Sequence, residues 1–284
     1  MTVRLKADWL PFLHRFRRRE IEIVFAGCPG KTFATGLELG AGDGFQSRLL
    51  SRWVSHLTST DYEPGVLSNP PDPSIAWAVC DAEDVDRVFA ARRFDLVFSS
   101  NLLEHLPNPQ RALRAMRAVL ADDGVAIHVV PGPFWKTTHL LLHLPNRAVL
   151  ILERLMRPGA VEAVARKLSG AGSEKADPAP RDNNPKTSRP RRGVIARLLV
   201  PEPHGVSRGN LREFLDFRRS RWIRELEEAG YDLVAVRKGP VASGYGFGLD
   251  RLRGLLEALG LASEFVYVAR KRGASSPYAS IWKP

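Results

Sequence analysis

The sequence predicts an α/β fold, a doubly wound and mostly parallel sheet that carries an α-helical insertion. Three observations lead to this prediction. Short apolar runs alternate with amphipathic segments from residue 35 to residue 131, the pattern of strands joined by helices. A turn with three closely spaced glycines follows the first apolar run, and polar residues follow the later ones. Because ligands of such sheets bind beyond the carboxyl ends of the strands, the turn and the polar residues also predict a binding site.

The first element is the segment GLELGAGDG, Gly36–Gly44, which predicts a strand, a tight turn and the start of a helix. Glycine tolerates positive φ and has no side chain that would keep a ligand away from the backbone. A dinucleotide site would need G-x-G-x-x-G, but Phe45 occupies the place of the third glycine, so the spacing is G-x-G-x-G. Glu38, two residues before Gly40, would repel a phosphate group and would tolerate a ligand that carries both an ammonium and a carboxylate group.

Further strands are expected at residues 57–60, 75–80 and 94–98. Asp61 ends the first of them, about 20 residues after the turn, the offset at which a carboxylate accepts both hydroxyls of a ribose in nucleotide-binding α/β units. Asp81 follows the next strand, and Asn101 follows the last. Taken singly, Asp61 or Asp81 could equally be a helix cap. Acids at the ends of strands in this order favour one shared site.

Four segments, taken in order, resemble the motif series of class I S-adenosyl-L-methionine-dependent methyltransferases: Gly36–Gly44, Thr60–Pro64, Cys80–Glu83 and Phe94–Pro109. The loop SSNLLEHLPNP is similar to that of the members that act on small molecules and lipids. The resemblance covers residues 35–131 well and the part from residue 204 loosely. It implies a Rossmann-like fold, S-adenosyl-L-methionine as cofactor, and methyl transfer to a small-molecule or a lipid- or glycan-linked acceptor.

The resemblance also implies a role for each matched residue. The methionine part of the cofactor would lie over Glu38, Gly40, Gly42 and Gly44, and Asn101 would face it through its backbone. Asp61 would bind the ribose hydroxyls, Tyr62 would lie beside the adenine, and Asp81 and Ala82 would meet the adenine edge.

Methyl transfer to a hydroxyl group requires a base that takes the proton of the acceptor. His105 follows the fourth strand, close to where the methyl group should lie, and His204 opens the segment after the insertion. Both are candidate catalytic bases, and Tyr245 in a glycine-rich stretch is a third. The competing interpretations are a helix-start residue for His105 and a polar loop residue for His204. No clustered ligands indicate a metal site.

The chain is expected to have three parts. Residues 1–133 hold an N-terminal helix and the cofactor-binding half of the methyltransferase domain, residues 134–203 form a helical insertion with a disordered basic loop, and residues 204–284 complete the same sheet with a last strand that is antiparallel. Pro145 is expected to split residues 134–157 into two short apolar helices. A helix is expected from Asn210 to Ala229, opened by a capping box with Glu213.

The net charge of +11 is concentrated in the predicted loop. Residues 166–197 hold nine basic and three acidic residues, an excess of +6. Such charge suits an anionic membrane surface, a nucleic acid or simply solvent, and the lack of interleaved aromatic residues disfavours nucleic acid. Together with the apolar residues 134–157, the basic segment 166–197 suggests peripheral membrane contact. Residues 134–157 could instead cover the mouth of the active site or contact a second copy.

Bulk features favour a reducing compartment. Cys28 and Cys80 show neither disulfide nor metal spacing, no signal peptide is recognised at the start, and no apolar run is long enough to span a bilayer. We expect a cytoplasmic protein, with membrane association as an added possibility. Two other functions stay open: a non-catalytic scaffold with the same fold that binds a membrane or protein partner, and an RNA methyltransferase.

Overall fold

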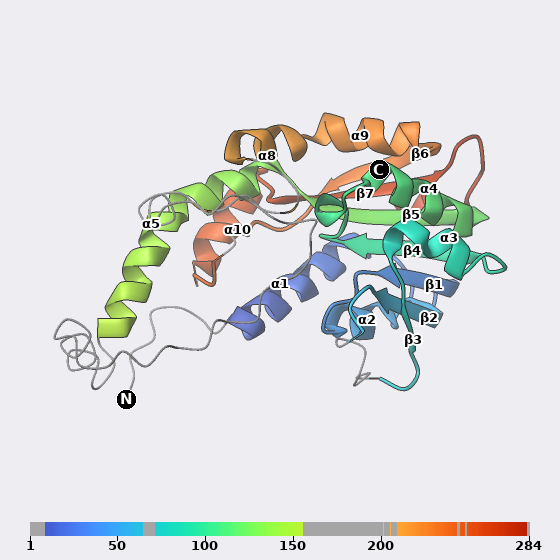
Figure 1. Cartoon of the computed structure of the whole chain (residues 1–284), viewed down its shortest axis with the longest axis horizontal. Helices are drawn as coiled ribbons and strands as arrows, with labels where there is room; N and C mark the ends of the chain where they lie inside the picture. The colour runs from blue at the N-terminus through green and yellow to red at the C-terminus, as the bar shows by residue number, and fades with distance from the viewer. Residues whose placement is uncertain are drawn as a thin grey trace, which may run out of the picture.

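The computed structural model describes residues 9–64, 72–155, 201, 205, 209–242, 245–247 and 249–282. Within these residues, one seven-stranded sheet has the order β3-β2-β1-β4-β5-β7-β6 (Figure 1). The strands are β1 (Phe33–Leu39), β2 (Val54–Asp61), β3 (Ala76–Val79), β4 (Phe94–Ser100), β5 (Leu120–Pro131), β6 (Tyr231–Lys238) and β7 (Glu264–Lys271). The described pairs are parallel except those of β7, which runs antiparallel to both neighbours. The predicted doubly wound, mostly parallel sheet with an inserted antiparallel strand is confirmed.

Helices cover both faces of the sheet (Figure 1). They are α1 (Trp9–Val24), α2 (Phe45–Leu50), α3 (Val85–Val88), α4 (Pro109–Val119), α5 (Pro133–Leu155), α8 (Asn210–Asp216), α9 (Arg219–Glu228) and α10 (Asp250–Ala258), with short 3-10 turns η1 (Ala82–Asp84), η2 (Leu103–His105) and η4 (Pro277–Ile281). The core on one face packs α4 and α9 against the strands through Met116 and Trp222. On the other face, α1 and α2 pack through Val24 and Leu50. The apolar positions of α4 recur at helical spacing, which is why this face is buried.

The prediction of two helices split by Pro145 is wrong. The chain stays helical through this residue, and α5 is one helix of 23 residues. Proline removes one main-chain hydrogen bond and crowds the preceding turn, which bends a helix without having to end it. Among the described residues, none of the helices combines the length and apolarity needed to cross a bilayer. The predicted basic segment 166–197 lies outside the described residues.

The single helix predicted from Asn210 to Ala229 is also wrong, because Phe217 and Arg218 separate α8 from α9. The capping box is absent. Gly209 caps α8 without a side-chain bond, and Glu213 turns into the protein instead. Its Oε2 lies 2.6 Å from Nζ of Lys136 on α5, with both side chains fully buried. A tertiary ion pair has therefore replaced the local cap, and it fastens α5 to α8.

Candidate functional site

The turn after β1 brings bare main chain to the carboxyl edge of the sheet. Gly40, Gly42 and Gly44 have φ angles of 75°, 54° and 72°, in the left-handed region that favours glycine. A Cβ atom at Gly40 would lie 3.1 Å from Cδ1 of Leu102, so this glycine allows the turn to pass close to the loop after β4. A Cβ atom at Gly42 would meet nothing within 4 Å. The backbone at Gly42 therefore faces open space.

Asp61, at the end of β2, holds this turn in place. Its Oδ2 accepts a hydrogen bond from the Gly42 backbone N–H at 2.9 Å, and its Oδ1 accepts one from the Glu63 N–H at 3.1 Å. The helix-cap alternative is not seen for this residue. Two carboxylate oxygens offer about four acceptor positions, so Asp61 can bind hydroxyl groups in addition to the two amides.

Glu38 lies inside the protein beside β2. Its side chain is buried, and its Oε2 accepts a hydrogen bond of 2.7 Å from Ser59 Oγ. Burial raises the pKa of this carboxyl to about 7, with hydrogen bonds acting in the opposite direction. Near neutral pH, Glu38 is therefore partly protonated. Its predicted role at the methionine group remains a prediction.

The predicted adenine-facing residues follow β2 and β3, whose ends lie together because Asp61 pairs with Val79. Tyr62 is 63% exposed. Asp81 caps η1, its side chain accepting from the Glu83 N–H at 2.9 Å, while Ala82 is buried. The cap that was the alternative for Asp81 is thus present. It occupies Oδ1, and the roles of Asp81, Ala82 and Tyr62 towards adenine stay predictions.

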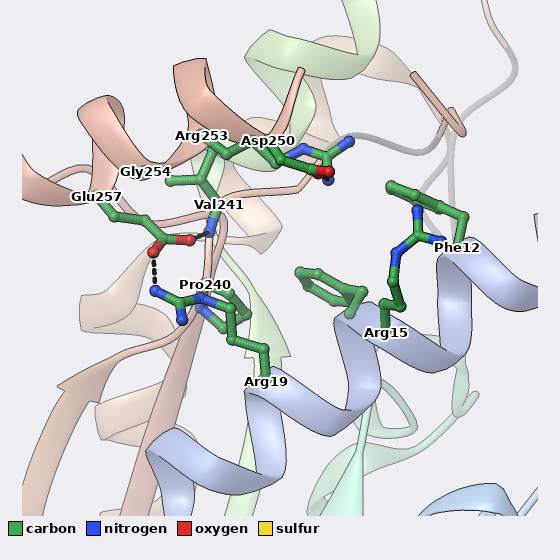
Figure 2. Close-up of a pocket in the computed structure, with 10 residues that line it drawn as sticks. Phe12, Arg15, Arg19, Pro240, Val241, Asp250, Arg253, Gly254 and Glu257 are labelled. Atoms are coloured by element: carbon green, nitrogen blue, oxygen red, sulfur yellow. Dashed lines mark hydrogen bonds and ion pairs between the residues drawn. The ribbon is translucent and has the colours of Figure 1, made fainter. Parts of the chain in front are cut away.

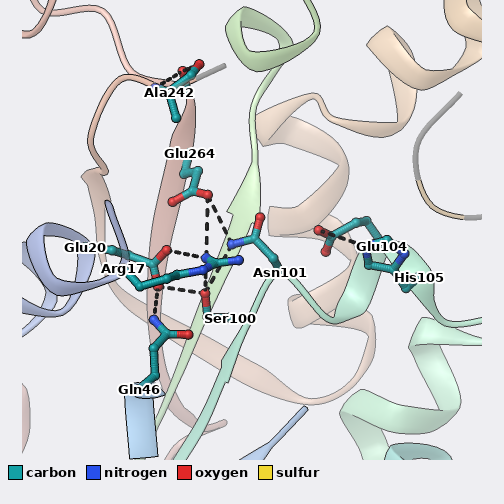
Figure 3. A network of polar contacts seen from close by, with 10 residues as sticks. Arg17, Glu20, Gln46, Ser100, Asn101, Glu104, His105, Ala242 and Glu264 are labelled. Carbon is teal, nitrogen blue, oxygen red and sulfur yellow. Dashed lines mark hydrogen bonds and ion pairs between the residues drawn. The ribbon is translucent and has the colours of Figure 1, made fainter. Parts of the chain in front are cut away.

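A polar network joins α1 to the end of β4 and the start of β7 (Figure 3). Nη1 of Arg17 donates to Oε2 of Glu20 at 2.6 Å and to Oγ of Ser100 at 2.9 Å. Ser100 Oγ donates to Oε1 of Glu20 at 2.6 Å. Asn101 Nδ2 donates to Oε1 of Glu264 at 3.1 Å. We call these five residues the α1 network. It fixes α1 over the carboxyl edge of the sheet.

Asn101 has a φ of 50°, and its backbone N–H donates to the Val129 carbonyl at 2.9 Å. Its backbone carbonyl is therefore the main-chain group that could meet the cofactor, as the prediction for this residue requires. The sequence interpretation had missed Arg17, Glu20 and Glu264. A signal for Glu20 exists, because it follows Phe12 and Phe16 at four-residue spacing on the apolar face of α1.

Glu104 and His105 lie in η2, after the network. Glu104 is 5% exposed, and among the described residues neither of its carboxyl oxygens has a hydrogen-bond partner. Nε2 of His105 lies 3.8 Å from Glu104 Oε1 (Figure 3). Burial raises the pKa of Glu104 to about 8, and burial together with the charge of Arg17 lowers the pKa of His105. Near neutral pH, this pair therefore favours a neutral carboxyl beside a neutral imidazole.

The other two candidate bases have different outcomes. His204 lies outside the described residues, but Gly205 has a φ of 62°, and a Cβ atom there would overlap the carbonyl oxygen of Glu104. Tyr245 contacts α5: its hydroxyl lies 2.9 Å from Nδ1 of His143, and its ring stacks on that of His139. Burial raises the pKa of Tyr245 to about 12. These contacts favour a structural role for Tyr245.

No metal-binding cluster of three or more His, Cys, Asp or Glu side chains occurs among the described residues. The open backbone at Gly42 and the free acceptor positions of Asp61 fit a nucleoside with an amino-acid tail, such as S-adenosyl-L-methionine. The open backbone at Gly42 would leave room for the cofactor over the main chain, and Asp61 would bind its ribose.

The comparisons with known proteins agree with this geometry. A family model described as a methyltransferase domain matches residues 37–128. An S-adenosylmethionine-dependent methyltransferase from Mesorhizobium loti is similar in structure, with a TM-score of 0.50 and 16% identity. The match covers 90% of this chain and 100% of that chain. The complex between the Haloferax volcanii Trm112 methyltransferase activator and a candidate methyltransferase has a TM-score of 0.51 and 10% identity, with 93% of each chain covered.

No curated protein matches the sequence. The structural matches show the fold, and the family match shows the domain that the glycine turn, β2, β3 and β4 build. Residues 37–128 therefore match a methyltransferase domain, and the chain has the fold of S-adenosylmethionine-dependent methyltransferases.

Proposed function

We propose that this methyltransferase acts on a hydroxyl or amine group of a small-molecule or a lipid- or glycan-linked acceptor, which binds between α1 and η2. The observation that carries the proposal is the Glu104 carboxyl, buried without a hydrogen-bond partner among the described residues and 3.8 Å from His105. A buried polar group that is left unpaired is costly, and such groups concentrate at functional sites. The loop that holds this pair also packs on the glycine turn through Leu102 and Gly40.

The bound cofactor would supply a methyl group on a sulfonium, which a nucleophile displaces in line. The chain positions the two reactants and excludes water, which accounts for much of the rate in such reactions. His105 would accept the proton that the acceptor loses, because its lowered pKa keeps the imidazole neutral. Charge on His105 would in turn favour ionisation of Glu104. The proton lost by the acceptor would reside on His105, whose side chain is 43% exposed, so solvent can stabilise the imidazolium until it releases the proton.

Release of S-adenosylhomocysteine from full-length protein, measured with panels of alcohols, amines and lipid-linked sugars, tests the proposal. His105→Gln should lower kcat about 10²- to 10⁴-fold while leaving the Kd for S-adenosylhomocysteine unchanged. His56→Gln, an exposed histidine on β2, is the matched control. Equal turnover by the two variants would exclude His105 as the base, and His204→Gln would then be the next variant.

Calorimetry with S-adenosylhomocysteine separates the other classes of function. A non-catalytic scaffold need not bind this product. An RNA methyltransferase would instead bind RNA with an affinity that falls steeply as salt rises.

We also propose peripheral membrane contact through α5, because Leu141, Leu144 and Ile151 are more than half exposed. Flotation with anionic vesicles tests it: Leu144→Asp should reduce binding, and equal flotation of variant and wild type would remove α5 as the contact.

A further inference from the structure

Two cavities adjoin one another beneath the helices that flank the acceptor side. The first, of about 340 Å³, lies between α5 and α10 and has an almost wholly apolar lining that includes Phe134, Leu142, Leu252, Leu256 and Leu261. The second, of about 390 Å³, lies between α1 and α10 (Figure 2) and is lined by Phe12, Arg15, Arg19, Asp250, Arg253 and Glu257 among others. Val241 and Arg253 line both cavities. Each volume falls within the range of small-molecule sites.

The second cavity carries surplus positive charge. Arg19 is paired with Glu257, and Nη1 of Arg253 donates to Oδ1 of Asp250 at 3.0 Å. Arg15 has no hydrogen-bond or ion-pair partner within the part of the chain that the structure describes, and Figure 2 shows its side chain rising from α1 into the cavity. Burial lowers the pKa of Arg253, and the charge of Arg15 acts in the same direction. The guanidinium groups of Arg15 and Arg253 repel each other, and an anion bound between them would relieve this repulsion.

The first cavity continues an apolar surface that lacks a cover among the described residues. None of the described residues of α10 is buried. Two of its leucines are widely exposed, Leu252 at 47% and Leu255 at 57%. Across the cavity, Leu141 on α5 is 71% exposed. Exposed apolar side chains gathered around an apolar cavity favour the binding of an apolar group. The arrangement therefore joins an apolar cavity to an anion-attracting one.

The wall shared by the cavities leads directly to the acceptor side. Gly239 N–H donates to the Glu264 carbonyl at 2.9 Å, and the Ala242 N–H donates to Ser263 Oγ at 2.8 Å. These bonds hold the segment around Val241 against the start of β7. The Glu264 side chain there belongs to the α1 network and bonds Asn101. A molecule in the cavities would thus lie beside the network that borders the reacting groups.

We infer that the two cavities bind an anionic amphiphile, with its hydrocarbon chain between α5 and α10 and its anionic group at Arg15 and Arg253. On the proposed function, on which this step rests, this amphiphile is the methyl acceptor or carries it. The charge of the second cavity argues for this occupant over a second copy of the chain, because Arg15 and Arg253 of two copies would repel each other if these faces met.

Binding of dansyl-undecanoate, a fluorescent anionic amphiphile, to the full-length protein below the micelle concentration tests the inference. Saturable binding is expected, with dodecyl phosphate displacing the probe at least tenfold better than dodecanol. Leu252→Asp, which places a charge in the cavity lining, should weaken binding at least tenfold. Leu255→Asp, on the same helix but outside the lining, should leave it within twofold. Arg15→Gln should abolish the preference for the phosphate, and Arg18→Gln, an exposed arginine outside the cavity, should preserve it.

The inference would be overturned if the probe did not bind saturably, or if Leu252→Asp and Leu255→Asp lost affinity for it equally. So would a dimer that Leu252→Asp dissociates and that excludes the probe, because a second copy would then cover the surface. The Kd for S-adenosylhomocysteine, measured in parallel, checks that each variant is folded. It also separates the two proposals: amphiphile binding without cofactor binding would refute the methyltransferase mechanism alone, and the converse would refute the amphiphile site alone.

Discussion

Replacing Glu104 by Gln should change how the stability of the protein depends on pH. In the folded chain, burial raises the pKa of this carboxyl from its ordinary 4.5 to about 8. The difference of about 3.5 pKa units corresponds to a cost of about 5 kcal/mol for ionising the buried group, as an upper bound, since one unit is worth about 1.4 kcal/mol.

The sign follows from proton binding. Between pH 4.5 and about 8, the folded state holds the proton of Glu104 while the unfolded state releases it. The free energy of unfolding of the wild type should therefore fall as the pH rises through this window, and the loss should be complete above it. Glu38, whose pKa burial raises to about 7, adds to the same trend. Glu104→Gln cannot ionise, so its advantage over the wild type should grow with pH by up to about 5 kcal/mol.

Urea unfolding at pH 5, 7 and 9 measures this difference, provided that the m-values of the two proteins agree. Asp72→Asn is the control, and its stability relative to the wild type should stay constant from pH 5 to pH 9. Asp72 is partly exposed, and hydrogen bonds from Ser74 lower its pKa, so its contribution to stability is lost only as the pH falls below the range of the assay. If the stability of Glu104→Gln and that of the wild type run parallel from pH 5 to pH 9, the argument from burial is refuted.

Three further outcomes are expected. Asp61→Asn keeps an acceptor for the Gly42 amide but loses the charge, so the Kd for S-adenosylhomocysteine should rise about 10- to 100-fold by calorimetry, and an unaltered Kd would count against the ribose role. Lys136→Met or Glu213→Leu should each cost about 3–5 kcal/mol in urea unfolding, since each breaks a buried ion pair, and the double variant should be more stable than either; strictly additive losses would contradict the pairing. Because the pKa of His105 is lowered, kcat for release of S-adenosylhomocysteine should decline only below the ordinary histidine range, and this acidic limb should vanish in His105→Gln; a limb that persists would point to another base.

Much of the cofactor side could be predicted from the sequence. The order of strands and helices, the glycine turn and the acids after β2 and β3 are local patterns, and parallel strands bring their ends to one edge whatever else the chain does. The same local reasoning failed where a distant residue intervened. Glu213 has the spacing of a capping box, yet its carboxylate pairs with Lys136 on another helix. Pro145 ends many helices, yet α5 continues through it.

Short-range periodicity and turn geometry predict the fold class and the edge of the sheet at which a ligand would bind, and the resemblance of four motifs to methyltransferases implies the cofactor. Which charges are buried depends on how distant segments pack together. Arg17 appears in the sequence as one member of a basic run, and Glu104 as one acid in a loop. Their environments arise when α1, β4 and β7 meet. Desolvation and hydrogen bonding depend on that meeting, so the protonation of Glu104 and the contacts of Arg17 could not be predicted from the sequence.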